Sequence, residues 1–212
     1  MNEKIVYGIF GIPGSGKSTQ GRLLEANKNL HLIHISTGTV FNDIKYNKKD
    51  MDEYKELIPM MKARDDDAKL YPDDITAREL DKYVNEFIEK RIYDPDSQIL
   101  LFDGYPRNLN QVNLMSGKYK MTKLAFLQLP QEVGLDRIVN KRLEEEGRPE
   151  DQNVDARRKS IKEHEQGIIQ IYYHFKDIKA TSSLGLYPEI RLVDGNQPVE
   201  VVYKELESFF KP

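Results

Sequence analysis

Five short apolar runs, separated by longer amphipathic stretches, set the pattern of this 212-residue chain. Each run is too short for a typical helix, and the first two are rich in β-branched residues, which predicts strands. The third run is almost unbroken and ends in an acid, as is typical of a central parallel strand covered on both faces. The predicted strands are residues 5–10, 31–35, 98–103, 123–129 and 189–193.

The stretches between the runs carry apolar residues three or four positions apart, which predicts helices with one buried face. Leu23 and Leu24 are expected to face the sheet from the first helix. Strands that alternate with helices predict an α/β fold with a doubly wound, five-stranded parallel sheet, whose ligands bind at the carboxyl ends of the strands. We expect helices at about 19–26, 75–92, 132–143, 154–175 and 199–210, and short helices between 39 and 69.

The first apolar run leads directly into a glycine-rich segment, residues 11–18, with the spacing G-x-x-x-x-G-K-S. Its glycines let successive backbone N–H groups turn toward one anion, and the helix that follows presents its positive end to the same anion. In such a phosphate-binding loop Lys17 reaches the β- and γ-phosphates, and the Ser18 hydroxyl is a ligand of Mg²⁺. We therefore expect a bound nucleoside triphosphate.

Composition and charge exclude several other classes of protein. A net charge of −3 argues against nucleic acid or a membrane surface as the main partner. The chain has no cysteine, so it can form neither disulfides nor thiolate metal sites. No secretory leader and no apolar run of about 18 residues is evident in the sequence, so we expect a cytoplasmic protein without a membrane segment.

Several further motifs follow the predicted strands or lie between them. Ser36-Thr37-Gly38 ends the second strand, and Phe-Asp-Gly-Tyr-Pro-Arg at 102–107 ends the third. Together with the phosphate-binding loop, and with the segments 70–73, 136–139 and 193–195, they make the chain resemble the adenylate kinase family of nucleoside monophosphate kinases. The resemblance covers nearly the whole chain, in the family's order. It implies transfer of a phosphoryl group from MgATP to AMP, giving two ADP, with Mg²⁺ as the cofactor. We expect the protein to be a monomer.

The resemblance also implies which residues hold the donor nucleotide. Arg137 matches an arginine that stacks on the ATP base, and Asp103 matches the acid that holds the water shell of Mg²⁺. Arg148 and either Arg157 or Arg158 match arginines that stabilise the transferred phosphoryl group. We select Arg158 of these two neighbours, although the helix register leaves the choice open. The predicted ATP-binding residues are Gly14, Ser15, Gly16, Lys17, Ser18, Thr19, Arg137 and Gln197.

The resemblance also implies which residues bind the acceptor nucleotide. Arg107 matches an arginine that grips the monophosphate, since a planar guanidinium suits two phosphate oxygens. Thr37 and Gln111 match residues that favour AMP over pyrimidine nucleotides, and an amide can read the donor and acceptor edge of adenine. The predicted AMP-binding residues are Thr37, Gly104, Arg107 and Gln111. The predicted metal-binding residues are Ser18 and Asp103. The predicted catalytic residues are Lys17, Asp103, Arg107, Arg148 and Arg158.

The acceptor site departs from the family at two positions. Thr39 and Asn42 stand where the family has an aspartate and an arginine. Losing one charge-assisted bond to the acceptor phosphate would typically cost about 1.5 to 3 kcal/mol. Lys45, one helical turn after Asn42, or Arg64 could supply the missing charge.

A third departure concerns the donor phosphates and the lid. Lys141 stands where the family has an arginine, with Arg142 next to it, and either could hold the phosphates. The lid is short and has no Cys or His to bind zinc. The expected division is a core of 1–35, 76–141 and 154–212, a helical monophosphate-binding insertion of 36–75, and a short lid of 142–153.

These departures leave other interpretations open. The chain could be a kinase for another nucleoside or deoxynucleoside monophosphate, or a nucleotide-binding protein whose transfer is impaired by Asn42. A small-molecule kinase on the same scaffold is disfavoured by Gln111 and by the Tyr-Pro-Arg run. The choice between ATP and GTP as the donor stays open.

Overall fold

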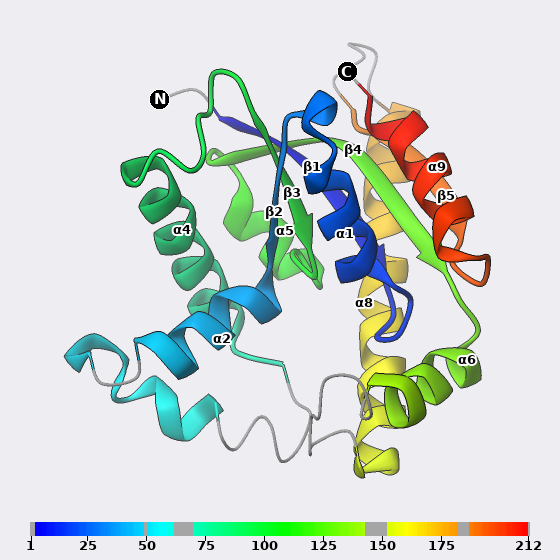
Figure 1. Cartoon of the computed structure of the whole chain (residues 1–212), viewed down its shortest axis with the longest axis horizontal. Helices are drawn as coiled ribbons and strands as arrows, with labels where there is room; N and C mark the ends of the chain where they lie inside the picture. The colour runs from blue at the N-terminus through cyan, green and yellow to red at the C-terminus, as the bar shows by residue number, and fades with distance from the viewer. Residues whose placement is uncertain (1–2, 49–50, 62–69, 143–151, 182–186, 212) are drawn as a thin grey trace.

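The computed structural model describes residues 3–48, 51–61, 70–142, 152–181 and 187–211. All five predicted strands form, and they pair in parallel in the order β2-β3-β1-β4-β5 (Figure 1). The predicted α/β fold is therefore confirmed. The strands are β1 Lys4–Gly11, β2 Leu32–Ser36, β3 Ile99–Asp103, β4 Tyr119–Gln128 and β5 Glu189–Asp194.

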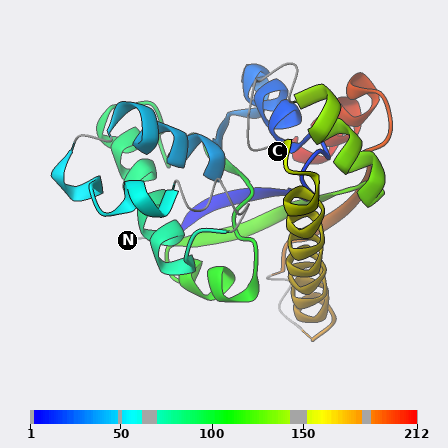
Figure 2. The ribbon, with the colours of Figure 1, turned by 90° about the horizontal axis from the view of Figure 1, so that it is seen from below.

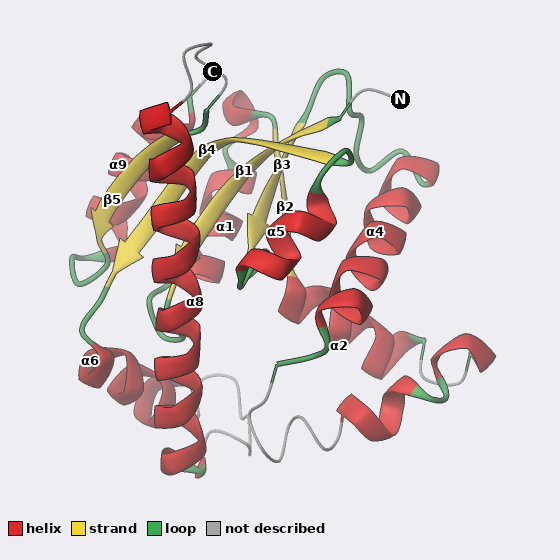
Figure 3. Ribbon diagram, turned by 180° about the vertical axis from the view of Figure 1, so that it is seen from behind, coloured by secondary structure: helices red, strands yellow, loops and turns green. Residues whose placement is uncertain are grey.

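Helices cover both faces of the sheet. In the view of Figure 3, α8 and α5 lie in front of the strands, while α1 and α9 lie behind them. Helix α5 was missed by the sequence prediction, because it has only seven residues and shows no clear period. The helices are α1 Lys17–Ala26, η1 Lys28–Leu30, α2 Thr37–Asn47, η2 Asp52–Tyr54, α4 Asp73–Glu89, α5 Leu109–Met115, α6 Gln131–Asp136, the π-helical turn η3 Arg137–Arg142, α8 Val154–Thr181 and α9 Val199–Phe210.

The core follows from the alternation of side chains along β1. Tyr7 and Ile9 pack under α1 and α9 in one cluster of buried residues, whereas Phe10 packs under α8 on the opposite face. Leu24 of α1 is fully buried in the first cluster, but Leu23 is 39% exposed. The expectation that both leucines face the sheet is wrong, because consecutive residues of a helix point about 100° apart.

The carboxyl ends of the strands meet at one edge of the sheet, where the functional residues gather. Ser36 at the end of β2 is in register with Asp103 at the end of β3, and Asp103 pairs with Ile9 near the end of β1. Seen from this edge, α2 and α4 lie to one side and α6 and α8 to the other (Figure 2). No helix in the described parts of the chain is long and apolar enough to cross a membrane.

The end of α2 is tied to α4 by Lys48. Its ammonium lies 3.0 Å from Asp43 Oδ2 and 2.6 Å from Glu86 Oε1, and its side chain is only 16% exposed. Burial disfavours the charged form of each group, but the hydrogen bonds and ion pairs outweigh it. They raise the pKa of Lys48 and hold the pKa values of Asp43 and Glu86 below their usual range.

Replacing Lys48 with methionine is expected to lower the free energy of unfolding at neutral pH by about 1 to 2 kcal/mol, because two half-shielded carboxylates lose their shared cation. The difference in the free energy of unfolding between the variant and the wild type should shrink below about pH 4. Carboxylates whose folded pKa is lowered stabilise the fold above their unfolded pKa and lose that contribution as the pH falls. Urea unfolding of both proteins at neutral and acid pH checks this, and an equal difference at both pH values would contradict it.

Candidate active site

The glycine-rich loop between β1 and α1 closes on its own backbone. Gly14 and Gly16 adopt φ values of +82° and +90°, which side chains other than glycine rarely tolerate. A Cβ on Gly14 would also lie 2.4 Å from the carbonyl oxygen of Gly134 in α6. Lys17 Nζ donates to the carbonyls of Gly11 and Ile12, at 2.7 and 3.1 Å. The loop thus holds a lysine ammonium at its mouth, beside the N-terminus of α1.

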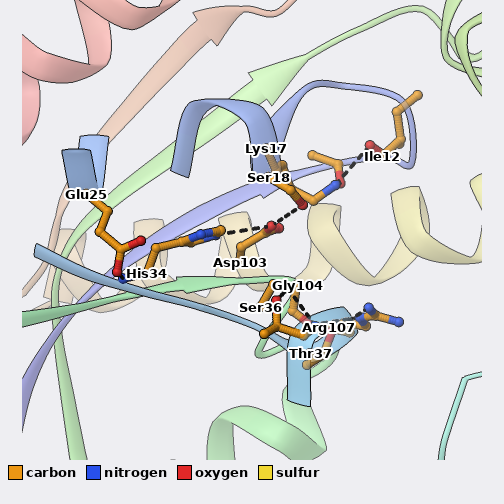
Figure 4. Close-up of polar contacts among 12 residues, drawn as sticks. Ile12, Lys17, Ser18, Glu25, His34, Ser36, Thr37, Asp103, Gly104 and Arg107 are labelled. Carbon is orange, nitrogen blue, oxygen red and sulfur yellow. Dashed lines mark hydrogen bonds and ion pairs between the residues drawn. The ribbon is translucent and has the colours of Figure 1, made fainter. Parts of the chain in front are cut away.

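The buried carboxylate of Asp103 lies next to this loop (Figure 4). Ser18 Oγ donates to Asp103 Oδ2 at 2.5 Å, and His34 Nε2 lies 3.5 Å from the same oxygen. A separation of 3.5 Å is an electrostatic contact rather than a good hydrogen bond. Glu25 of α1 accepts from the backbone N–H of His34 at 3.0 Å. The contact fixes β2 against α1 beside the acid.

Burial alone would raise the pKa of Asp103. The contact with His34, the nearby charge of Lys17 and the hydrogen bond from Ser18 outweigh burial and hold the pKa of Asp103 below its usual range. The carboxylate is therefore ionised at neutral pH. A hydroxyl oxygen and an ionised carboxylate are the hard oxygen ligands that Mg²⁺ prefers, so Ser18 and Asp103 fit a magnesium site.

Arg107 lies across the cavity from the loop. Its Nε donates to Gly104 O and its Nη2 donates to Thr37 Oγ1, both at 2.7 Å. Gly104 has a φ of +73°, and this turn brings the arginine back beside the end of β3. Gly167 of α8 lets that helix approach closely, because a Cβ there would lie 2.1 Å from Arg107 O. The guanidinium is thus held by two elements, next to Asp103.

Arg137 lies on the opposite side of the phosphate-binding loop. Its Nη1 donates to Gly195 O at 3.1 Å and, more weakly, to Gly14 O at 3.4 Å. Its Nη2 lies 3.3 Å from Asn196 Oδ1. Arg137 therefore joins the end of α6 to the loop between β5 and α9, which also contains Gln197.

One cavity of about 620 Å³ runs along the carboxyl edge of the sheet. Its lining combines the phosphate-binding loop, the buried acid and residues from both flanking groups of helices. The structure thus brings together twelve of the predicted residues, which are Gly14, Ser15, Gly16, Lys17, Ser18, Thr19, Thr37, Asp103, Gly104, Arg107, Arg137 and Gln197.

The placement of two neighbouring arginines on α8 is the reverse of the prediction. Arg157 is 8% exposed and lines the cavity. Arg158 does not line the cavity, is 53% exposed and forms an ion pair with Glu132 of α6. The reason is the register of α8: Ile161, one helical turn beyond Arg157, is buried against α6, and the next residue after Arg157 is turned about 100° from that face.

Gln111 lies beside the main cavity rather than in it. It lines a small second pocket with Phe41, Tyr71 and four other residues, and the two pockets share Thr37 and Arg107. Gln111 is 1% exposed, and both ends of its amide already have protein partners. The place of Gln111 in the AMP site stays a prediction, and the sequence did not show these contacts.

Several predicted residues cannot be placed in the cavity. Arg148, Arg64 and most of the expected lid lie outside the described residues, as do the side chains of Lys141 and Arg142. Lys45 does not line the cavity and lies over the ring of Tyr46, with Nζ 5.4 Å from the ring centroid.

Three basic residues of the cavity lining were missed by the sequence prediction. Arg22 lies one helical turn beyond Ser18 on α1, and this spacing was the available signal. His34 is the second of these residues. It lies two positions before Ser36 and so shares its face of β2, which is the signal that points toward Asp103. His164 lies on the same face of α8 as Arg157, two turns further along, and its Nδ1 lies 2.7 Å from Ser160 O.

Comparison with known proteins agrees with this geometry. A sequence model of the family described as adenylate kinase matches residues 9–177. The adenylate kinase of Flavobacterium psychrophilum is 30% identical over 190 residues, covering 86% of this chain and 92% of the relative. The adenylate kinase of Flavobacterium johnsoniae is 30% identical, in an alignment that covers 94% of this chain and 95% of the relative. Adenylate kinase 1 of Synechocystis is 28% identical, in an alignment that covers 96% of each protein. The chain therefore belongs to the adenylate kinase family and is an ATP-dependent nucleoside monophosphate kinase.

Proposed function

We propose that this enzyme transfers the terminal phosphoryl group of MgATP to AMP and forms two ADP. The observation that carries the proposal is that a phosphate-binding loop and Arg107 flank the buried carboxylate of Asp103 in one and the same cavity. Phosphoryl transfer needs two phosphate groups in line and neutralisation of their charge, with little covalent chemistry by the protein. The cavity supplies a cationic group on each side of the acid.

Donor binding follows from the loop. The backbone N–H groups of residues 14–19 and the N-terminus of α1 face the phosphates, and Lys17 exchanges its two carbonyl partners for phosphate oxygens. Arg137 and Gln197 lie where the adenine of ATP is expected to rest. Ser18 and Asp103 would hold Mg²⁺, which neutralises charge on the donor phosphates when bound.

Acceptor binding follows from the opposite wall. Arg107 already has its guanidinium fixed by Gly104 and Thr37, so little side-chain entropy is lost when it grips the acceptor phosphate. Thr37 and Gln111 are the proposed readers of adenine. Arg22 and Asn42 both line the cavity, so Arg22 is a better candidate than Lys45 for the charge that Asn42 does not supply.

Closure completes the mechanism. We propose that the insertion 36–75 and the lid 142–153 close over the core formed by 1–35, 76–141 and 154–212. Closure excludes water that would otherwise accept the phosphoryl group. Arg148 in the lid then joins the cations around the transferred group. We expect a cytoplasmic monomer, whose mass light scattering can check.

The two neighbouring arginines of α8 give a matched test of the phosphate cations. Arg157→Ala is expected to lower kcat about 10- to 100-fold, because it removes a shielded charge from the cavity wall. Arg158→Ala should change kcat less than about threefold, since it breaks only an exposed ion pair with Glu132. Steady-state ADP formation measures both, and a larger loss in the Arg158 variant would contradict the assignment.

The reaction itself is tested with a panel of acceptors. With ATP and Mg²⁺ present, ADP formation is measured for AMP, dAMP, CMP, UMP and GMP, and the products are separated by chromatography. We expect AMP to give the highest kcat/KM and two ADP for each AMP consumed. Another monophosphate as the best acceptor would overturn the substrate assignment, and no transfer to any of them would favour a protein that only binds nucleotides.

A further inference from the structure

Asp73, at the start of α4, accepts hydrogen bonds from three side-chain amides at the start of α5. Asn108 Nδ2 and Gln111 Nε2 donate to Asp73 Oδ1 at 2.9 and 2.7 Å, and Asn110 Nδ2 donates to Oδ2 at 2.8 Å. Burial raises the pKa of Asp73, but these three bonds outweigh it and leave the pKa below its usual value. The carboxylate is therefore ionised at neutral pH and offers only acceptors to the amides.

The other end of the Gln111 amide is also held. Gln111 Oε1 accepts from the backbone N–H of Arg107 at 2.8 Å. A carboxylate can bond only the NH₂ end of an amide, and a backbone N–H can bond only the oxygen end. The two partners therefore fix which end of the Gln111 side chain faces which way, independently of how the nearly identical O and N atoms are placed.

This arrangement leaves Gln111 with one N–H and one oxygen lone pair beyond those already used. Gln111 lines the small second pocket, which shares Thr37 and Arg107 with the main cavity. Phe41 and Tyr71 line the same pocket and stack, with ring centroids 3.7 Å apart and planes 19° apart. The pocket is only about 10 Å³ as it stands, so a planar base meets the remaining polar groups of Gln111 only once the pocket walls, Phe41 and Tyr71 among them, move apart.

The fixed amide distinguishes between purines. Adenine presents an amino donor at position 6 and an acceptor at N1, whereas hypoxanthine and guanine present an acceptor at position 6 and a donor at N1. An amide in one orientation can bond one of these pairs and opposes the other, while an amide that turns over can serve both. Specificity for adenine therefore requires an amide that cannot turn over.

We propose that Asp73 is a positioning residue, which sets the base specificity of the acceptor site by holding the Gln111 amide in one orientation. The proposal rests on the proposed function, because it takes AMP as the acceptor. Asp73 acts through Gln111 and does not itself touch the base. The backbone N–H of Arg107 favours the same orientation of the Gln111 amide, but through a bond between neutral groups. The charged carboxylate of Asp73 therefore contributes more to holding that orientation.

The test compares AMP with IMP as acceptors in three variants. Asp73→Ala should lower the ratio of kcat/KM for AMP to kcat/KM for IMP by at least about tenfold, through loss of one charge-assisted bond. The KM for ATP should not change, because the donor site lies on the other side of Asp103. Asn110→Ala is the matched control, since it removes an amide from the same carboxylate but leaves Gln111 held, and its ratio should stay within about twofold of wild type.

A wild-type ratio in Asp73→Ala, with the KM for ATP unchanged, would overturn the proposal. If that variant does not fold, Asp73→Asn decides the question. The remaining oxygen of the asparagine gives Gln111 a weaker, neutral bond. We therefore expect the AMP-to-IMP ratio of this variant to lie below that of the wild type, and an unchanged ratio would again overturn the proposal. Failure of the proposed function is distinct, because the wild-type enzyme would then not use AMP before any residue is replaced.

Discussion

Replacing Lys17 with methionine is expected to lower kcat by about a thousandfold or more while leaving the fold intact. The Lys17 ammonium lies at the mouth of the phosphate-binding loop, 2.7 Å from Gly11 O and 3.1 Å from Ile12 O. Methionine has a similar length and no charge, so the developing charge on the transferred group loses its nearest protein cation. Steady-state ADP formation measures the loss, and circular dichroism and thermal unfolding report the fold.

Lys28→Met is the matched control for this prediction. Lys28 is exposed at the start of η1, and the same substitution there removes a surface charge that does not line the cavity. Its kcat should stay within about twofold of wild type. A folded Lys17→Met variant that turns over at the wild-type rate would show that the loop is not the donor site.

Replacing Asp103 with asparagine is expected to lower kcat about 100- to 1,000-fold and to raise the Mg²⁺ concentration needed for half-maximal activity. Asparagine keeps the size of the side chain but removes the charge that a metal prefers. The pKa of Asp103 lies below its usual range, so the wild-type carboxylate is ionised at every pH from about 5 upward. The wild-type activity should therefore show no loss from protonation of Asp103 between about pH 5 and 8.

Asp96→Asn serves as the control, because Asp96 is exposed in the loop before β3. Its Mg²⁺ dependence should match that of the wild type. If Asp103→Asn were folded and kept both its kcat and its Mg²⁺ requirement, the assignment of Asp103 and Ser18 to the metal site would be wrong. Thermal unfolding of both variants separates a local effect from a loss of structure.

The strands and the phosphate-binding loop could be predicted because their signals are local. A short apolar run between turn signals predicts a buried strand. The loop is defined by glycines at fixed spacing, of which Gly14 and Gly16 adopt φ values of +82° and +90°. Asp103 was predictable because it directly ends such a run. The parallel pairing of the strands followed from their alternation with helices, whereas their order in the sheet was not predicted.

Other features depend on contacts between distant segments, which the sequence shows only weakly. Arg157 and Arg158 are neighbours, and the choice between them is made by the packing of Ile161 against α6. The amide of Gln111 was recognised, but its partner Asp73 lies 38 positions away in the chain. His34 contacts Asp103, which lies on a different strand, and its spacing from Ser36 on β2 is only a weak local signal for that contact.

The central claim is that one cavity holds two nucleotides, with the donor on the phosphate-binding loop and the acceptor on Arg107. A crystal structure with a bisubstrate dinucleotide, two adenosines joined by five phosphates, tests it most directly. We predict one adenine beside Arg137 and Gln197, the other in the pocket of Thr37 and Gln111, and the phosphate chain between Lys17 and Arg107. A second adenosine outside that pocket, or a phosphate chain that bypasses Arg107, would contradict the account.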